Sequence, residues 1–128
     1  MLIAAMFAMV IAVFLGLWLG ALYLIHEEPP KHVPRVGMVH GAAGATAVAL
    51  LLLALQGPRR GVHTGAGGFG WTAFTLMALA LAGGVTILTL HLRKRGAPTL
   101  LIAMHAMLGV AGSVMLSAWW SSPASFGR

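Results

Sequence analysis

Four long apolar runs, separated by short polar segments, constrain this chain more than any other feature. The runs cover about residues 1–25, 36–56, 71–92 and 99–120, and a helix needs roughly 20 apolar residues to cross a bilayer. Short connections force consecutive helices to run up and down. We therefore predict an all-α fold, an integral-membrane four-helix up-and-down bundle, with residues 1–128 forming a single transmembrane domain.

The composition supports a membrane location and excludes several kinds of site. Hydrophobic residues make up 59% of the chain and charged residues 8%, whereas soluble domains carry roughly 25% charged residues. The chain has no cysteine, which excludes disulfides, thiolate metal sites and covalent c-type haem attachment. The net charge of +6 comes from basic residues between the runs, so we expect lipid and other membrane subunits as partners, and no nucleic acid.

The loops define two ends of the predicted bundle. Side B is the end with loops 26–35 and 93–98, and side A is the end with both chain termini and loop 57–70. We expect residues 26–35, with their three prolines, to lie outside any helix, and residues 121–128 to form a loosely ordered tail. Side B carries more basic residues than side A, which by the positive-inside rule places both termini outside the cytoplasm, in a bacterial inner membrane.

Two histidines lie within apolar runs, where an ionisable group is a hypothesis of function by default. At a rise of ~1.5 Å per residue, His40 lies about 6 Å from the start of the second run and His105 about 9 Å from the start of the fourth. Each is followed four residues later, on the same helix face, by a glycine, Gly44 or Gly109. The two histidines can therefore face each other at similar depth on the side B half.

Such a pair suits haem iron better than a bare metal ion. Neutral imidazole binds zinc, copper and iron, but a structural zinc site wants four ligands, and no carboxylate lies at this depth. Haem iron needs only two axial ligands, and Gly44 and Gly109, with Gly41 and Gly112, leave room for a flat macrocycle. Basic residues on side B are the expected partners of the haem propionates, chiefly Arg35, Arg93 and Arg95. We predict one haem b with His40 and His105 as axial ligands.

Other interpretations of these residues stay open. His105 can make a hydrogen bond between helices, Met104 or Met107 can replace one axial histidine, and the glycines can serve helix packing alone. The remaining histidines lie in loops or near helix ends and are interpreted as interfacial or loop residues: His26, His32, His63 and His91. A quinone or proton role for His32 also stays open.

Two short segments resemble the haem-ligand segments of cytochrome b561-type membrane proteins. They are Val39-His40-Gly41-Ala42-Ala43-Gly44 and Met104-His105-Ala106-Met107-Leu108-Gly109. The resemblance implies a four-helix core that binds b-type haem through histidines on alternate helices, with His40 and His105 as one axial pair. His63 loosely matches the start of another ligand helix of that family, but no helix follows Trp120 to supply its partner. The sequence therefore departs from the two-haem pattern of the family.

A haem with both axial positions filled transfers electrons and does not bind oxygen. The chain has little mass outside the membrane, so we expect an electron-transfer subunit, working between a quinone and a partner protein, rather than an enzyme on its own. The main alternative is a cofactor-free accessory subunit of a larger respiratory or photosynthetic complex. A third is a small transporter or metal-handling channel that uses the side B histidines.

Overall fold

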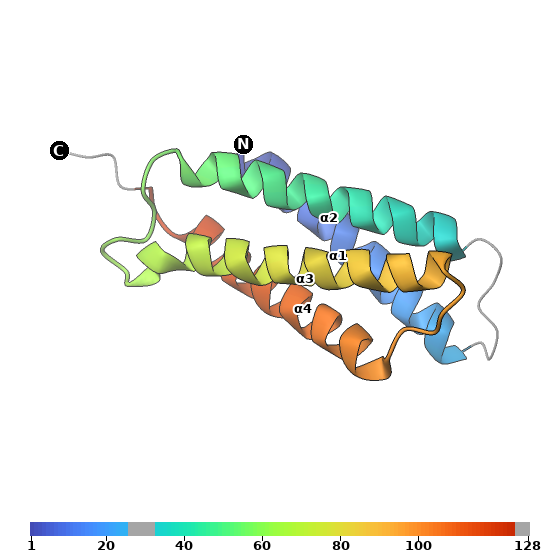
Figure 1. Ribbon diagram of the computed structural model, residues 1–128. Coiled ribbons are helices and arrows are strands. Elements are labelled where there is room, and N and C mark those ends of the chain that lie inside the picture. The colour runs from blue at the N-terminus through green and yellow to red at the C-terminus, as the bar shows by residue number, and fades with distance from the viewer. Residues whose placement is uncertain (26–32, 125–128) are drawn as a thin grey trace.

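The protein is a bundle of four long helices in a computed structural model that describes residues 1–25 and 33–124 (Figure 1). The helices are α1 (Leu2–Ile25), α2 (Val33–Leu55), α3 (Phe69–Leu92) and α4 (Thr99–Ser121), and a short 3-10 helix, η1 (Ala66–Gly68), precedes α3. The predicted all-α class and four-helix order are confirmed. Each of the four helices is long and apolar enough to cross a membrane, which indicates an integral membrane protein.

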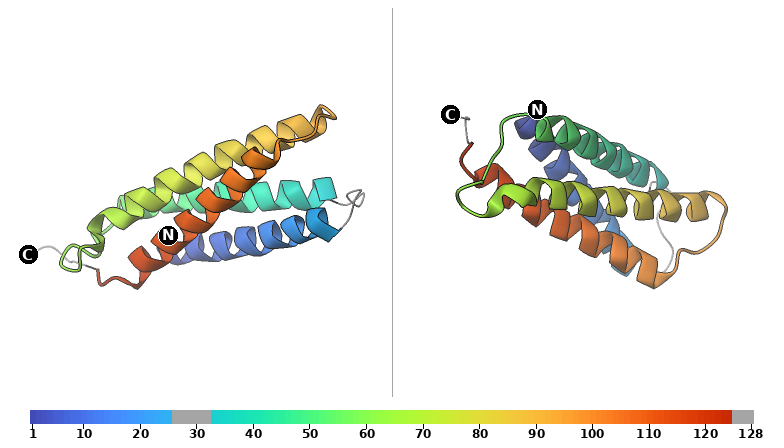
Figure 2. Two further views of the ribbon diagram at one scale, coloured as in Figure 1. Left: turned by 90° about the horizontal axis from the view of Figure 1, so that it is seen from below. Right: turned by 60° about the vertical axis from the view of Figure 1, so that its left-hand side comes forward.

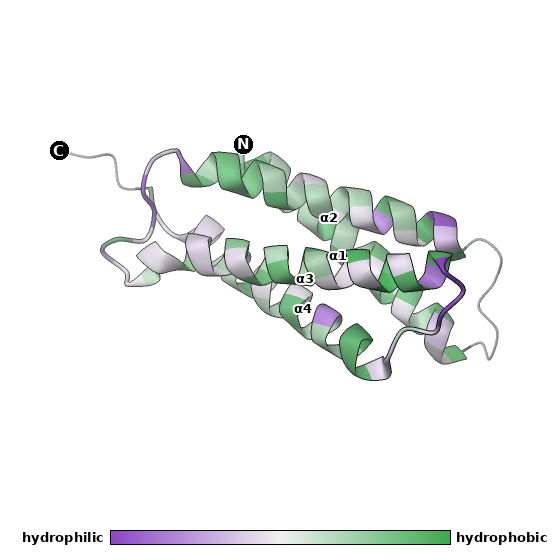
Figure 3. Cartoon of the chain, in the orientation of Figure 1, coloured by the Kyte–Doolittle hydropathy of each residue, from purple (hydrophilic) through white to green (hydrophobic). Residues whose placement is uncertain are grey.

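The outer surface of the bundle is apolar along the length of the helices. Figure 3 shows hydrophobic residues along all four helices and hydrophilic ones gathered toward the helix ends, apart from isolated turns within α2 and α4. Phe7, Phe14 and Met107 are 68%, 68% and 72% exposed. Water would make such a surface costly, whereas lipid chains solvate it.

Helix α2 begins earlier than expected, at Val33, and this corrects part of the predicted loop. Pro34 and Arg35 lie in its first turn. Proline is tolerated there because the first backbone N–H groups of a helix have no partner within the helix. The rest of the predicted loop, with His26 and His32, lies outside the described residues.

The helices pack as two hairpins, α1 with α2 and α3 with α4, which then pack side by side. Contacts between the hairpins run from α2 to α3 and from α1 to α4. Helices α2 and α4 are therefore diagonal neighbours across the bundle, as the two views of Figure 2 also show. A side chain from α2 can meet one from α4 only at the centre.

The two hairpins repeat the same packing. Buried residues of α1 recur at a constant offset in α3, as do those of α2 in α4. The equivalent pairs are Ala5 and Ala73, Met9 and Met77, Ala12 and Ala80, Ala47 and Gly112, and Leu51 and Leu116. The hairpins run in the same direction, so an approximate two-fold axis along the bundle relates them.

The buried core lies in the side A half of the bundle. Among the residues whose burial is described, the last buried one of α1 toward side B is Ala12 and that of α3 is Ala80, while α4 has none before Gly112. In α2, Val33 is the only buried residue between the side B end of the helix and Ala47. Figure 2, in its left view, shows the two hairpins separating toward side B. Protein interiors are normally close-packed, so the side B half lacks the core that the side A half has.

The start of the predicted C-terminal tail is held in place, which corrects the expectation of a loose segment from Ser121 onward. The Gly61 backbone N–H donates to the Pro123 carbonyl at 3.1 Å. The Arg60 guanidinium donates to the Trp120 carbonyl at 3.0 Å, and Ser122 is buried. These bonds tie the end of α4 to the loop between α2 and α3. Residues 125–128 lie outside the described part.

Candidate functional site

His40 and His105 meet at the centre of the bundle, as their positions in the sequence predict. Their ring centroids are 5.8 Å apart, and the ring planes are nearly perpendicular, at 85°. Both side chains are half-buried. With α2 beginning at Val33, each histidine lies about 10 Å from the side B end of its helix, at ~1.5 Å per residue. The pair sits where the buried core of the side A half stops.

Each histidine is held by a backbone carbonyl of its own hairpin. His40 Nδ1 lies 2.8 Å from the Ala12 carbonyl oxygen of α1, and His105 Nδ1 lies 2.7 Å from the Ala80 carbonyl oxygen of α3. A carbonyl oxygen only accepts hydrogen bonds, so both Nδ1 atoms carry the proton and donate it. The helix-to-helix hydrogen bond considered for His105 is therefore present, and His40 makes its equivalent.

In the neutral imidazole, this arrangement leaves the lone pair on Nε2. Neither Nε2 atom has a hydrogen-bond partner among the residues that the structure describes. An imidazole whose Nδ1–H donates to a backbone carbonyl, with a lone pair on Nε2, is the usual state of a histidine that binds a metal. The bonds to Ala12 and Ala80 fix the tautomer and limit ring rotation, so two acceptor nitrogens are presented in the same part of the bundle.

Two glycines let the rings lie against the neighbouring helices. A Cβ atom on Gly16 of α1 would lie 3.0 Å from His40 Cε1, and one on Gly84 of α3 would lie 3.0 Å from His105 Cε1. Gly16 and Gly84 follow Ala12 and Ala80 by one helical turn, so each pair forms a seat for one ring. These seats were not predicted, although α1 and α3 share the spacing Ala-x3-Met-x2-Ala-x3-Gly.

The glycines expected to leave room beside the histidines divide into two groups. Cβ atoms on Gly41, Gly44 and Gly109 would meet nothing within 4 Å. A Cβ atom on Gly112 would lie 2.7 Å from Met77 Cγ, so Gly112 serves the packing of α4 on α3 and leaves no room there. That part of the prediction is wrong, because Gly112 is the α4 equivalent of the buried Ala47.

The pair suits a metal that brings its own equatorial ligands. No group of three or more His, Cys, Asp or Glu within residues 1–25 and 33–124 is placed to hold a bare metal ion. Imidazole nitrogen binds a metal at about 2.0 Å, and with ring centroids 5.8 Å apart the two rings are near enough to share one metal ion. His40 and His105, with open space beside Gly44 and Gly109, would therefore suit a haem iron as ligands.

The basic residues predicted to hold haem propionates are at the expected end of the bundle. Arg93 and Arg95 follow α3, Arg35 lies in the first turn of α2, and all three are exposed. His91, in the last turn of α3, and His63, in the loop on side A, are also exposed. The structure does not bring His63 or His91 into the pair.

Comparison of the chain with protein-family models, with curated proteins and with solved structures gave no significant match.

Proposed function

We propose that this protein is a small b-type cytochrome subunit of a membrane, which carries electrons through one haem b between His40 and His105. The observation that supports this most strongly is the histidine pair itself. The pair comes from diagonal helices, each Nδ1 is fixed by a carbonyl of its own hairpin, and in the neutral rings each Nε2 keeps its lone pair. The resemblance of both segments to cytochrome b561-type ligand segments agrees with this proposal.

The residues around the pair have distinct roles in such a site. Ala12 and Ala80 hold the imidazoles in the ligating tautomer, since loss of either carbonyl contact frees the ring to turn. Gly44 and Gly109 provide open space beside each ligand. A haem held by His40 and His105 would supply one-electron oxidation and reduction, with a potential that depends on the apolar surroundings.

The basic residues of side B complete the proposed site. Arg35, Arg93 and Arg95 are exposed where the hairpins separate, and guanidinium groups bind carboxylates through paired hydrogen bonds. We assign them to the propionates, which places the polar edge of the haem toward side B. The basic excess of side B further assigns that side to the cytoplasm of a bacterial inner membrane. A membrane quinone and a partner protein are the proposed donor and acceptor.

An absorption spectrum of the purified protein tests the proposal directly. We expect a Soret band and a sharp alpha band on reduction, with the low-spin character of two nitrogen ligands. Colourless protein that is otherwise folded would instead favour the cofactor-free accessory subunit. Metal-dependent flux in liposomes without a haem spectrum would favour the transporter.

Single substitutions then test the ligands. His40→Ala and His105→Ala should each abolish the low-spin spectrum, because each removes one axial nitrogen. His91→Ala is the matched control, since His91 is also at the side B end but is exposed on α3. If His91→Ala removed the spectrum and His40→Ala left it intact, α3 would supply the second ligand and our pairing would be wrong.

A further inference from the structure

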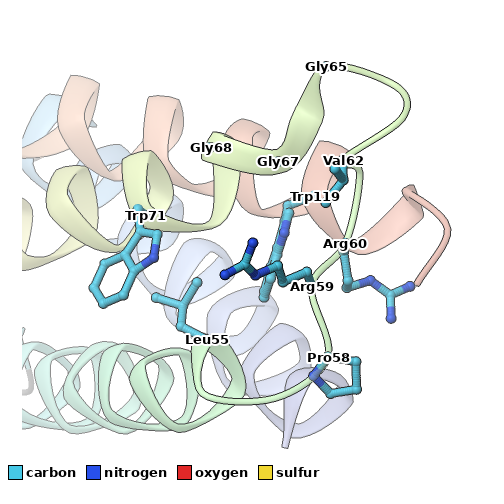
Figure 4. A pocket seen from close by; sticks show the side chains of 10 residues that line it. All are labelled: Leu55, Pro58, Arg59, Arg60, Val62, Gly65, Gly67, Gly68, Trp71 and Trp119. Atoms are coloured by element: carbon cyan, nitrogen blue, oxygen red, sulfur yellow. The ribbon is translucent and has the colours of Figure 1, made fainter. Parts of the chain in front are cut away.

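A second site lies at the opposite end of the bundle from the histidine pair. A cavity of about 650 Å³ opens there between the end of α2, the loop that follows it, η1, the start of α3 and the last turns of α4 (Figure 4). Leu55, Arg59, Arg60, Trp71 and Trp119 are among its lining residues. The haem proposal uses none of them.

Two donors in the wall of this cavity have no hydrogen-bond partner among residues 1–25 and 33–124. Trp119 is only 3% exposed, and its indole Nε1 is buried without a hydrogen-bond partner. Arg60 Nε is also buried and unpartnered, while the other end of the same guanidinium donates to the Trp120 carbonyl, which fixes the side chain. Burying a donor without an acceptor costs free energy, so this cavity favours a ligand that carries hydrogen-bond acceptors.

The charge of the cavity indicates an anion. Arg59 and Arg60 both line it, and the described residues, 1–25 and 33–124, contain no Asp or Glu to neutralise them. Gly68, the N-cap of α3, also lines the cavity, so the N-terminal end of this helix lies beside it. The positive end of the helix dipole adds to the attraction for an anion.

The position of the cavity indicates that the anion belongs to a lipid. The cavity lies where the apolar spans end, and Trp71, 56% exposed, lines it beside Leu55 (Figure 4). Tryptophan is enriched at this level of a membrane. We propose that the cavity binds the phosphodiester headgroup of an anionic membrane lipid, with Trp119 Nε1 donating to the phosphate and Arg59, whose guanidinium lies beside Trp119 in Figure 4, balancing its charge.

Native mass spectrometry of the full-length protein in detergent tests this proposal, with phosphatidylglycerol and phosphatidylcholine of the same acyl chains as probes. We expect one phosphatidylglycerol to be retained at least about tenfold more strongly than phosphatidylcholine. Arg59→Gln and Trp119→Phe should each weaken that retention by about tenfold, since a hydrogen bond or contact to a charged group is lost. Trp119→Phe keeps an aromatic ring in the wall and removes only the donor.

Two matched controls separate a built site from general attraction. Lys94→Gln removes one positive charge at the other end of the bundle, and Trp120→Phe changes an exposed indole of the same turn; neither should alter retention. In the unchanged protein, the indole N–H signal of Trp119 in an NMR spectrum should move when phosphatidylglycerol is added. This signal tests the proposal even if a variant fails to fold.

Several results would overturn the assignment. Equal retention of both lipids, or a loss with Lys94→Gln as large as with Arg59→Gln, would mean diffuse attraction only. Displacement of the lipid by millimolar inorganic phosphate would assign the cavity to a soluble anion. Displacement by an equimolar short-chain benzoquinone would assign it to a neutral carbonyl ligand. None of these outcomes bears on the haem spectrum, so this proposal and the proposed function fail or stand separately.

Discussion

Replacing Gly109 by leucine should separate room for a cofactor from room for helix packing. A Cβ atom on Gly109 would meet nothing within 4 Å, so the first atom of the new side chain adds no overlap to the fold, and leucine is a better helix former than glycine. If a macrocycle occupies that space, the added side chain overlaps it. Overpacking costs about 1–3 kcal/mol, which corresponds to roughly 5- to 150-fold weaker haem binding.

The assay for Gly109→Leu is the ratio of haem absorbance to protein, measured beside the thermal unfolding temperature in detergent. We expect haem content to fall while the unfolding temperature of the haem-free protein stays the same or rises. Gly44→Leu should behave alike, because its Cβ position is also open. Gly112→Leu is the matched control: its Cβ lies 2.7 Å from Met77 Cγ, so it should destabilise the haem-free protein itself. Unchanged haem content in both Gly44→Leu and Gly109→Leu would refute our reasoning.

Two further predictions concern the core and the orientation. Leu51→Ala and Leu116→Ala should each lower the free energy of unfolding by about 1–3 kcal/mol, because both side chains are fully buried at equivalent positions and burial against lipid, unlike burial against water, gains little. Thermal unfolding measures this loss, with Leu53→Ala, at a half-exposed position, as control. A large difference between the first two variants would contradict the repeat. A reporter that works only in the cytoplasm, fused after Arg128, should stay inactive if side B is cytoplasmic, and an active fusion would reverse the orientation.

The fold could be predicted almost entirely from the sequence because a membrane leaves a chain few choices. Backbone polar groups must be satisfied within each span, so four apolar runs with short connections have to become four antiparallel helices. The errors lie at the ends. Pro34 was interpreted as a helix breaker but occupies the first turn of α2, where its missing N–H costs nothing. Ser122 was placed in a loose tail, although contacts between Gly61 and Pro123 hold that segment.

Helix periodicity could predict the depth of the two histidines in the bundle but not the contacts of their rings. Depth along each helix was enough to bring His40 and His105 to one level. Which carbonyl each ring contacts depends on the rotation of α1 and α3 about their axes, and the low contrast between apolar faces in a membrane helix hides that rotation. The cavity at side A could not be predicted from the sequence for another reason, because it depends on how loop 57–65 folds over the end of α4.

The seats formed by Gly16 and Gly84 lead to a last prediction, which needs no haem. Because each Nδ1 donates to a carbonyl, nitrogen NMR of the haem-free protein should find both His40 and His105 with a proton on Nδ1. In Gly16→Ala the new Cβ lies 3.0 Å from the His40 ring, short of the ~3.5–4.0 Å of a relaxed carbon contact. The ring must therefore move, and the hydrogen bond to Ala12 that this movement strains is worth about 0.5–1.5 kcal/mol.

The His40 signals should change in Gly16→Ala while the His105 ring keeps its tautomer, and Gly84→Ala should do the reverse. Because the two seats have the same local geometry, each substitution should change the signals of the histidine in its own hairpin, and the two changes should be similar in size. A mutation in one hairpin that altered both rings to the same degree, or neither, would mean that the carbonyl contacts do not hold the imidazoles.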